Sequence, residues 1–118
     1  MKKILTIDDS GTILQIIKLT LKGHGFEVMT AANGEEGLNV LSNQEIDLVV
    51  TDINMPVMDG ITFIKEAKAV KPEIPIIVLS TESGDDLKKV AMANGAVGWI
   101  VKPFKPEPFL EMIKDIFS

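Results

Sequence analysis

Short apolar runs and longer amphipathic stretches alternate along the chain. Short runs that are rich in β-branched side chains predict strands, whereas apolar positions spaced by three or four predict helices. Three of the runs are nearly unbroken, as in parallel strands covered on both faces, but residues 27–30 alternate as an edge strand does. The runs that we expect to be strands are residues 3–7, 26–31, 46–51, 76–79 and 99–101.

The stretches between these runs carry helix signals. Ser10 and Asn33 are suited to cap the first two helices, and the five helices are expected around residues 13–21, 34–41, 61–67, 85–93 and 107–117. In the fourth helix we expect Leu87, Val90 and Ala91 to face the core. The alternating order predicts an α/β fold with an open, doubly wound parallel sheet, in which ligand sites lie beyond the carboxyl ends of the strands.

Length and composition are those of an ordinary globular domain, and they argue against several kinds of partner and site. The 118 residues are enough for one domain with its own core, which we expect to occupy residues 1–118. The net charge of −5 disfavours binding to nucleic acid or to anionic lipid. The chain has no cysteine, so disulfides and thiolate metal sites are excluded. No apolar run approaches the ~18 residues of a membrane span, so we expect a soluble, cytoplasmic protein without membrane insertion.

Charged side chains directly follow three of the predicted strands. Asp8 and Asp9 follow the first run, Asp52 follows the third, and Lys102 follows the last. If these strands are neighbours in a parallel sheet, the carboxylates converge at one edge, and like charges at close range are costly without a cation. An all-oxygen cluster suits Mg²⁺, and a nearby lysine can bind a second anion such as a phosphoryl group. The residues therefore predict a phosphoryl-transfer site.

Four motifs together resemble the receiver domain of two-component response regulators. They are Asp8-Asp9, Asp52 within TDINMPVMDG, Ser80 after the fourth strand, and Lys102-Pro103-Phe104. Each motif is weak alone, but the four in this order and at strand ends are highly specific. The resemblance covers essentially the whole chain and is strongest to the stand-alone chemotaxis (CheY-like) type. It implies a flavodoxin-like (βα)5 fold with five parallel strands in the order 2-1-3-4-5, and no output domain.

The resemblance implies that Asp52 is phosphorylated. Receivers of this family take a phosphoryl group from a histidine kinase onto the aspartate at this position, which forms an acyl phosphate. Lys102 and Ser80 are then expected to contact the phosphoryl oxygens, although Thr81 offers a neighbouring hydroxyl. The peptide bond between Lys102 and Pro103 is expected to be cis.

The resemblance also implies a magnesium site. Asp8, Asp9 and Asp52 are expected to hold Mg²⁺ together with the backbone carbonyl of Asn54 and with water. Because Mg²⁺ usually keeps several waters and takes one or two carboxylates directly, we expect Asp9 to bind it directly and Asp8 through water.

The family pattern assigns signalling roles to three further residues. Trp99 stands at the position of a switch aromatic that turns inward when Ser80 is drawn to the phosphoryl group. The alternative interpretation is that Trp99 is an ordinary half-buried aromatic residue of a strand. Asn54 and Glu82 match positions that tune the lifetime of the phosphoryl group. Phosphorylation is expected to alter a surface formed by residues 85–93, 99–101 and 107–117. A flagellar motor switch protein is the first expected target, and a phosphatase is a further expected partner.

Other functions are compatible with parts of this pattern. The chain could be a phosphotransfer intermediate of a phosphorelay, or a phosphate-independent receiver adaptor. An aspartyl phosphatase of the dehalogenase type would need a second aspartate where Asn54 stands. A flavodoxin-like cofactor binder would need a loop rich in Gly, Ser and Thr after the first strand, where Asp8 and Asp9 repel phosphate. As a receiver, the protein would catalyse only its own aspartyl phosphorylation and dephosphorylation.

Overall fold

Strands and helices alternate strictly in the computed structural model, which describes residues 1–82, 84–103 and 105–118. Each strand lies within two residues of its expected bounds. The strands are β1 (Lys3–Ile7), β2 (Glu27–Ala31), β3 (Leu48–Thr51), β4 (Ile76–Ser80) and β5 (Gly98–Val101). The helices are α1 (Gly11–Lys22), α2 (Gly34–Asn43), α3 (Gly60–Val70), α4 (Asp85–Ala93) and α5 (Pro106–Phe117). Within the described ranges, no helix is long and apolar enough to span a bilayer.

The strands form one parallel sheet in the order β2-β1-β3-β4-β5. This order confirms the predicted fold class, and β2 lies at an edge as its alternating pattern indicated. The register pairs Ile7 of β1 with Thr51 of β3, and Ser80 of β4 with Val101 of β5. The residues that follow these strands are therefore brought to one edge of the sheet.

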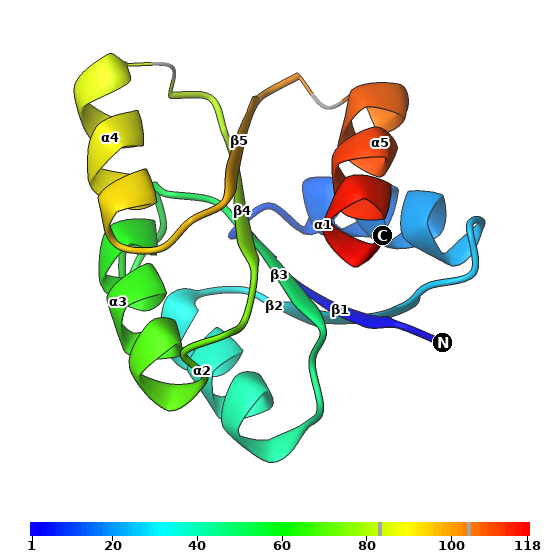
Figure 1. Cartoon of the computed structure of the whole chain (residues 1–118), viewed down its shortest axis with the longest axis horizontal. Coiled ribbons are helices and arrows are strands. Elements are labelled where there is room, and N and C mark those ends of the chain that lie inside the picture. Colours follow the sequence, from blue (N-terminus) through cyan, green and yellow to red (C-terminus); the bar gives the residue numbers. More distant parts are fainter. Residues whose placement is uncertain (83, 104) are drawn as a thin grey trace.

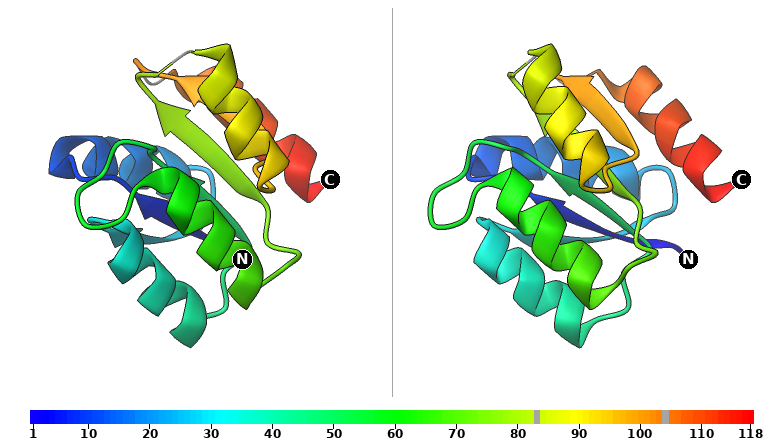
Figure 2. Two further views of the ribbon diagram at one scale, coloured as in Figure 1. Left: turned by 90° about the vertical axis from the view of Figure 1, so that its left-hand side faces the viewer. Right: turned by 60° about the vertical axis from the view of Figure 1, so that its left-hand side comes forward.

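Helices cover both faces of the sheet and divide the core in two (Figure 1). On one face, α2, α3 and α4 bury Leu41, Phe63 and Ala91 against the strands. On the other face, α1 and α5 bury Leu21 and Phe109. The turned views show α2, α3 and α4 stacked along one side of the sheet (Figure 2). Because each fully buried leucine or phenylalanine side chain stabilises the fold by about 1.5–3 kcal/mol, both layers hold the sheet in place.

Side-chain caps fix the start of three helices. The Ser10 hydroxyl accepts a hydrogen bond from the Ile13 N–H at 3.3 Å, and the Asn33 side chain accepts one from the Glu36 N–H at 2.9 Å. Both caps confirm the helix starts predicted from the sequence. Asp59 caps α3 by accepting from the Thr62 N–H at 2.9 Å, a cap that the sequence pattern did not identify.

One predicted core position is wrong. Val90 of α4 is 44% exposed, whereas Ala91 is fully buried and Leu87 is partly buried against the same core. Leu87 and Ala91 are four residues apart and lie on one face of the helix, and neighbouring residues point about 100° apart. Val90 therefore turns toward solvent although its spacing from Leu87 also suited an inward position.

Candidate functional site

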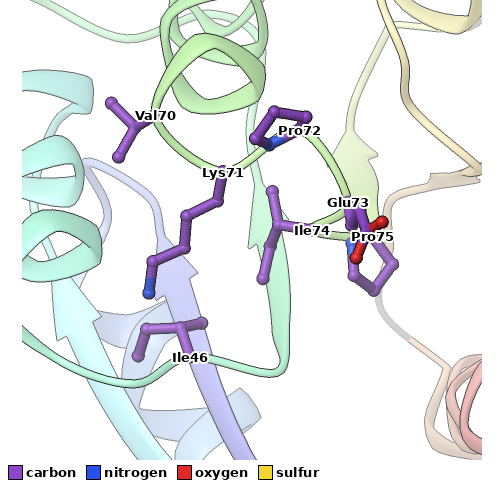
Figure 3. A pocket seen from close by; sticks show the side chains of 7 residues that line it. All are labelled: Ile46, Val70, Lys71, Pro72, Glu73, Ile74 and Pro75. Carbon is purple, nitrogen blue, oxygen red and sulfur yellow. The ribbon is translucent and has the colours of Figure 1, made fainter.

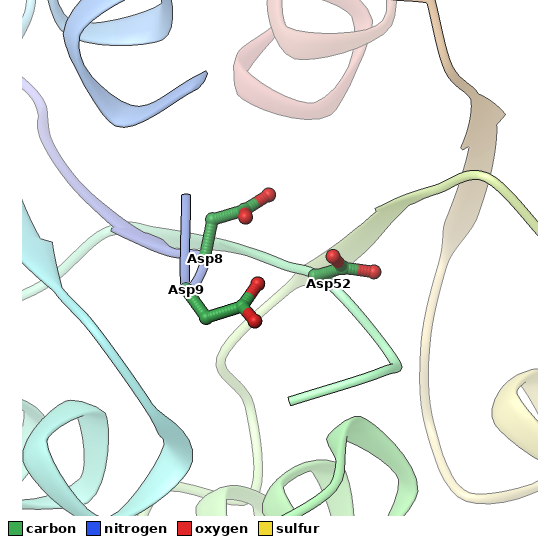
Figure 4. A group of neighbouring side chains, drawn as sticks. All are labelled: Asp8, Asp9 and Asp52. Carbon is green, nitrogen blue, oxygen red and sulfur yellow. The ribbon is translucent and has the colours of Figure 1, made fainter. Parts of the chain in front are cut away.

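Three carboxylates meet beyond the carboxyl ends of β1 and β3. Asp8 and Asp9 follow β1 directly and Asp52 follows β3, and one carboxylate oxygen from each lies within 4.8 Å of the others (Figure 4). Asp8 is 2% exposed and Asp52 is 7% exposed, whereas Asp9 lies at the surface. The parallel register explains this convergence, because it aligns the ends of the two strands.

Lys102 completes the cluster from β5. Its ammonium group donates to Asp8 Oδ2 at 2.8 Å and to Asp52 Oδ2 at 3.1 Å, so one cation bridges two buried carboxylates. Its backbone N–H donates to the Ser80 carbonyl at 2.8 Å, which continues the pairing of β5 with β4. The Lys102–Pro103 peptide bond is cis, as the family resemblance implied. Phe104, the last residue of that motif, lies outside the described residues.

Burial and ion pairing act on the cluster in opposite directions. Burial raises the pKa of Asp8 above its usual 3.8, although Lys102 and the Ser10 N–H lower it in part. Burial alone would lower the pKa of Lys102, but its hydrogen bonds to Asp8 and Asp52 outweigh this and raise the pKa. The lysine is therefore held charged, while the cost of burying Asp8 is met only in part.

The donor set fits a hard divalent cation. Three carboxylates from two loops, one of them exposed to solvent, offer the oxygen ligands that Mg²⁺ prefers while leaving room for water. Asn54 lies two residues after Asp52 on the same loop, at the surface. Asp8, Asp9 and Asp52 are therefore the residues that could hold the ion, and the backbone carbonyl of Asn54 stays a predicted ligand.

Ser80 and Glu82 extend the site along the loop after β4. Ser80 is fully buried at the end of β4, and its hydroxyl accepts a hydrogen bond from the Glu82 N–H at 3.2 Å. Thr81, the neighbouring residue with a hydroxyl, is exposed. The Glu82 carboxylate accepts from the Asn54 amide at 3.0 Å, and the Glu82 carbonyl accepts from the Trp99 indole N–H, also at 3.0 Å.

The loop between Asp52 and α3 is tightly folded. A Cβ atom on Gly60 would lie 2.3 Å from the Asp52 carbonyl oxygen, so only glycine allows α3 to start this close to the site. The Met58 N–H donates to the Pro56 carbonyl at 2.7 Å, and Val57 between them has φ 71°. This is a γ-turn with a positive φ, which is strained for a β-branched residue.

An apolar hollow of the described surface lies elsewhere. It opens at the amino-terminal end of β4, opposite the edge that carries Asp52 (Figure 3). Its lining is mainly apolar, and the Lys71 ammonium group across it donates to the Gln44 carbonyl at 3.0 Å. The residues that line it are Ile46, Val70, Lys71, Pro72, Glu73, Ile74 and Pro75. None of the site residues predicted from the sequence lines this hollow.

The family model, the related sequences and the solved structures that this chain matches all belong to one family. Residues 4–114 match the family model described as "Response regulator receiver domain". A chemotaxis protein CheY homolog from Campylobacter jejuni is 37% identical and is covered over 92% of its length by 98% of this chain. The crystal structure of chemotaxis protein CheY4 from Vibrio cholerae is 40% identical with a TM-score of 0.93, and 98% of each chain is covered.

A further solved structure is a complex that contains BeF3 and Mg²⁺. The CheX–CheY–BeF3–Mg²⁺ complex from Borrelia burgdorferi contains a chain that is 31% identical to this one, with a TM-score of 0.95. The alignment covers 99% of this chain and 90% of the other. Since the family model spans residues 4–114 and the two solved structures match this fold with TM-scores of 0.93 and 0.95, this chain belongs to the response regulator receiver domain family.

Proposed function

We propose that Asp52 accepts a phosphoryl group from a phosphorylated histidine kinase in a reaction that needs Mg²⁺, in the cytoplasm. One observation carries this proposal, namely the Lys102 ammonium group bonded at once to Asp8 and Asp52 with Asp9 beside them. A site of this kind gathers positive charge around a buried carboxylate nucleophile. Its acceptors can also hold a dication, so the arrangement is suited to an incoming phosphoryl group.

The residues of the site account for each change of charge during transfer. An oxygen of Asp52 forms a bond to phosphorus while the phosphorus–nitrogen bond of phosphohistidine breaks, and its electron pair returns to the imidazole ring. Lys102 exchanges its bond to Asp52 for one to a phosphoryl oxygen, and the Ser80 hydroxyl donates to another. A magnesium ion, when bound to this cluster, supplies neutralisation of the charge on the phosphoryl oxygens. No general base is required, because a carboxylate nucleophile has no proton to lose when it attacks.

We further propose that phosphorylation is read out at the surface formed by α4, β5 and α5. The route from the site is short, because Ser80 ends β4 and Trp99 lies in the neighbouring strand β5. The phosphoryl group favours one of two states of this surface, which then binds a target such as a flagellar motor switch protein. The Borrelia relative forms a complex with CheX, so we infer that this chain also has a partner that removes the phosphoryl group. The protein acts on no other substrate.

Intact-mass measurement after incubation with acetyl phosphate and Mg²⁺ tests the proposal. The expected result is the gain of one phosphoryl group. No gain is expected when Mg²⁺ is chelated before the phosphodonor is added. Asp52→Asn should gain no phosphoryl group. The matched control is Asp47→Asn, because Asp47 lies at the opposite end of β3 from Asp52, and this variant should behave like the wild type. A wild-type protein that gains no phosphoryl group from acetyl phosphate or phosphoramidate, although it binds Mg²⁺, would overturn the proposal and favour a phosphate-independent adaptor.

A further inference from the structure

The apolar hollow at the amino-terminal end of β4, which we call the β4 hollow, has walls that other parts of the protein fix in place. Two of its residues are prolines, Pro72 and Pro75, which restrict the loop between α3 and β4. The Ile74 N–H donates to the Lys71 carbonyl at 3.1 Å. The Pro75 carbonyl accepts from the Val49 N–H of β3 at 3.0 Å. The hollow therefore exists before a ligand binds, as in most small-molecule sites.

Lys68 of α3 binds the backbone of the same loop. Its ammonium group donates to the Pro72 carbonyl at 3.2 Å and to the Ile74 carbonyl at 2.7 Å. Two of its three donor hydrogens are thus used by the loop itself. Lys71, rather than Lys68, lines the hollow, so Lys71 is the cation that a ligand in the β4 hollow would meet.

The Lys71 ammonium group has donor hydrogens left for a ligand. It donates to the Gln44 carbonyl at 3.0 Å, and a lysine ammonium group carries three donors. Among the described residues, it forms no ion pair with a carboxylate. Figure 3 shows Glu73 beside Pro75, whereas the Lys71 ammonium group extends toward Ile46. The hollow therefore offers a positive charge that no described side chain pairs.

The remaining lining and the size of the hollow suit a small apolar group. Ile46, Val70 and Ile74 contribute aliphatic side chains, and Val70 is 46% exposed. The volume is about 630 Å³, within the roughly 300–1,000 Å³ of small-molecule sites. The seven lining residues are far fewer than the roughly 20–30 that a stable protein partner contacts on each side. A small molecule therefore fits the hollow better than a second protein does.

We propose that the β4 hollow binds a small free carboxylic acid that carries an aromatic or branched aliphatic group. The carboxylate of this ligand accepts hydrogen bonds from the Lys71 ammonium group, which pairs the charge of the lysine. Its apolar group covers Val70 and removes the exposed surface of that side chain from water. The β4 hollow and Asp52 lie at opposite ends of the strands, so this inference goes beyond the proposed function and does not depend on it.

Titration with phenylacetate, followed by NMR of the side-chain methyl groups, tests the site. The methyl resonances of Ile46, Val70 and Ile74 should shift together with a dissociation constant of about 1 mM, as expected for so small a ligand. The methyl resonances of Ile113, which belongs to the core on the other face of the sheet, should stay in place. Asp52→Asn should bind phenylacetate like the wild type, so the outcome does not depend on phosphorylation.

Variants of Lys71 distinguish recognition of the carboxylate from unspecific apolar contact. Lys71→Met should weaken phenylacetate binding about tenfold, as expected for the loss of one charge-assisted hydrogen bond, whereas Lys71→Arg should bind nearly like the wild type. Lys65→Met, a matched change at an exposed position of α3, should have no effect. Phenylacetamide, which has the same ring without the charge, should bind the wild type about tenfold more weakly than phenylacetate does.

Three results would overturn the inference. The first is that the methyl resonances of the hollow do not shift at millimolar phenylacetate. The second is that phenylacetamide binds as tightly as phenylacetate, or that Lys71→Met and Lys71→Arg bind phenylacetate with equal affinity. The third is that a short peptide ending in a phenylalanine carboxylate binds more tightly than phenylacetate, because the hollow would then be a site for a peptide terminus and not for a free acid.

Discussion

Replacement of Lys102 by methionine should destabilise the metal-free protein at neutral pH. The change removes the cation that lies 2.8 Å from Asp8 and 3.1 Å from Asp52 but keeps an unbranched side chain of similar length. At an effective dielectric constant of about 20, these distances correspond to attractions of about 6 and 5 kcal/mol. The cost of burying the lysine offsets much of this, so we expect a net loss of about 3–5 kcal/mol, as for other buried ion pairs that lose one partner.

The pH dependence of the loss of stability in Lys102→Met follows from the pKa of Asp8. Without Lys102, the pKa of Asp8 should rise further above its usual 3.8, because burial still raises it and the hydrogen bond and charge of the lysine, which lower it, are lost. A carboxyl whose pKa is higher in the folded than in the unfolded protein favours folding below its unfolded value and loses that contribution as the pH rises through its folded value. Lys102→Met should therefore recover stability as the pH is lowered from 7 toward about 4.

Urea unfolding with a chelator present measures the effect, and Lys105→Met is the matched control. Lys105 is exposed beside α5, so its replacement should change the free energy of unfolding by less than about 0.5 kcal/mol. Addition of Mg²⁺ should reduce the difference in free energy of unfolding between Lys102→Met and the wild type, because a ligand that binds only the folded state stabilises it. The reasoning is refuted if Lys102→Met and Lys105→Met unfold at the same urea concentration in the absence of divalent ions.

Three further changes test other parts of the structure. The hydroxyl of Thr6 is buried with no hydrogen-bond partner among the described residues, so Thr6→Val should raise the free energy of unfolding by about 1 kcal/mol, and a decrease in urea unfolding would contradict this. The Thr62 N–H lowers the pKa of Asp59 below its usual 3.8, so the cap stabilises the protein above that pH and the effect fades as the pH falls through the lower folded value. Asp59→Ala should accordingly cost about 1 kcal/mol at neutral pH and much less in acid, and equal losses at both pH values in thermal unfolding would argue against the cap. Val57→Asn should stabilise the protein by about 1 kcal/mol in urea unfolding, because Asn tolerates φ 71° better than Val does, and no gain would show that Val57 carries little strain.

Local signals accounted for most of the fold. Ser10 and Asn33 are polar residues placed immediately before an amphipathic pattern, and both cap the helices that they were expected to begin. The bounds of α4 agree with the prediction, but Val90 within it does not face the core. Spacing identifies a helix more reliably than it identifies which apolar residues the neighbouring elements cover, because the latter depends on packing far along the chain.

The candidate site was likewise predictable only in part. The proximity of Asp8 and Asp52 follows from parallel strands alone, since any such sheet aligns residues at its carboxyl edge. The pattern also placed Lys102 directly after the last predicted strand, and the family resemblance added its cis bond to Pro103. The hydrogen bond between the Trp99 indole and the Glu82 carbonyl could not be predicted, because it depends on a side-chain rotamer and on the path of a loop.

Trp99 also determines what an optical measurement can detect in this protein. The chain has one tryptophan and no tyrosine, so the emission excited near the red edge of its ultraviolet absorption comes from a single indole ring. That ring is half-buried in β5 and its N–H is bonded to the loop that follows β4. Any event that changes the polarity or hydrogen bonding around this ring therefore alters the intrinsic fluorescence of the whole molecule. The unlabelled protein thus contains its own reporter, located in β5 and bonded to the loop that follows β4.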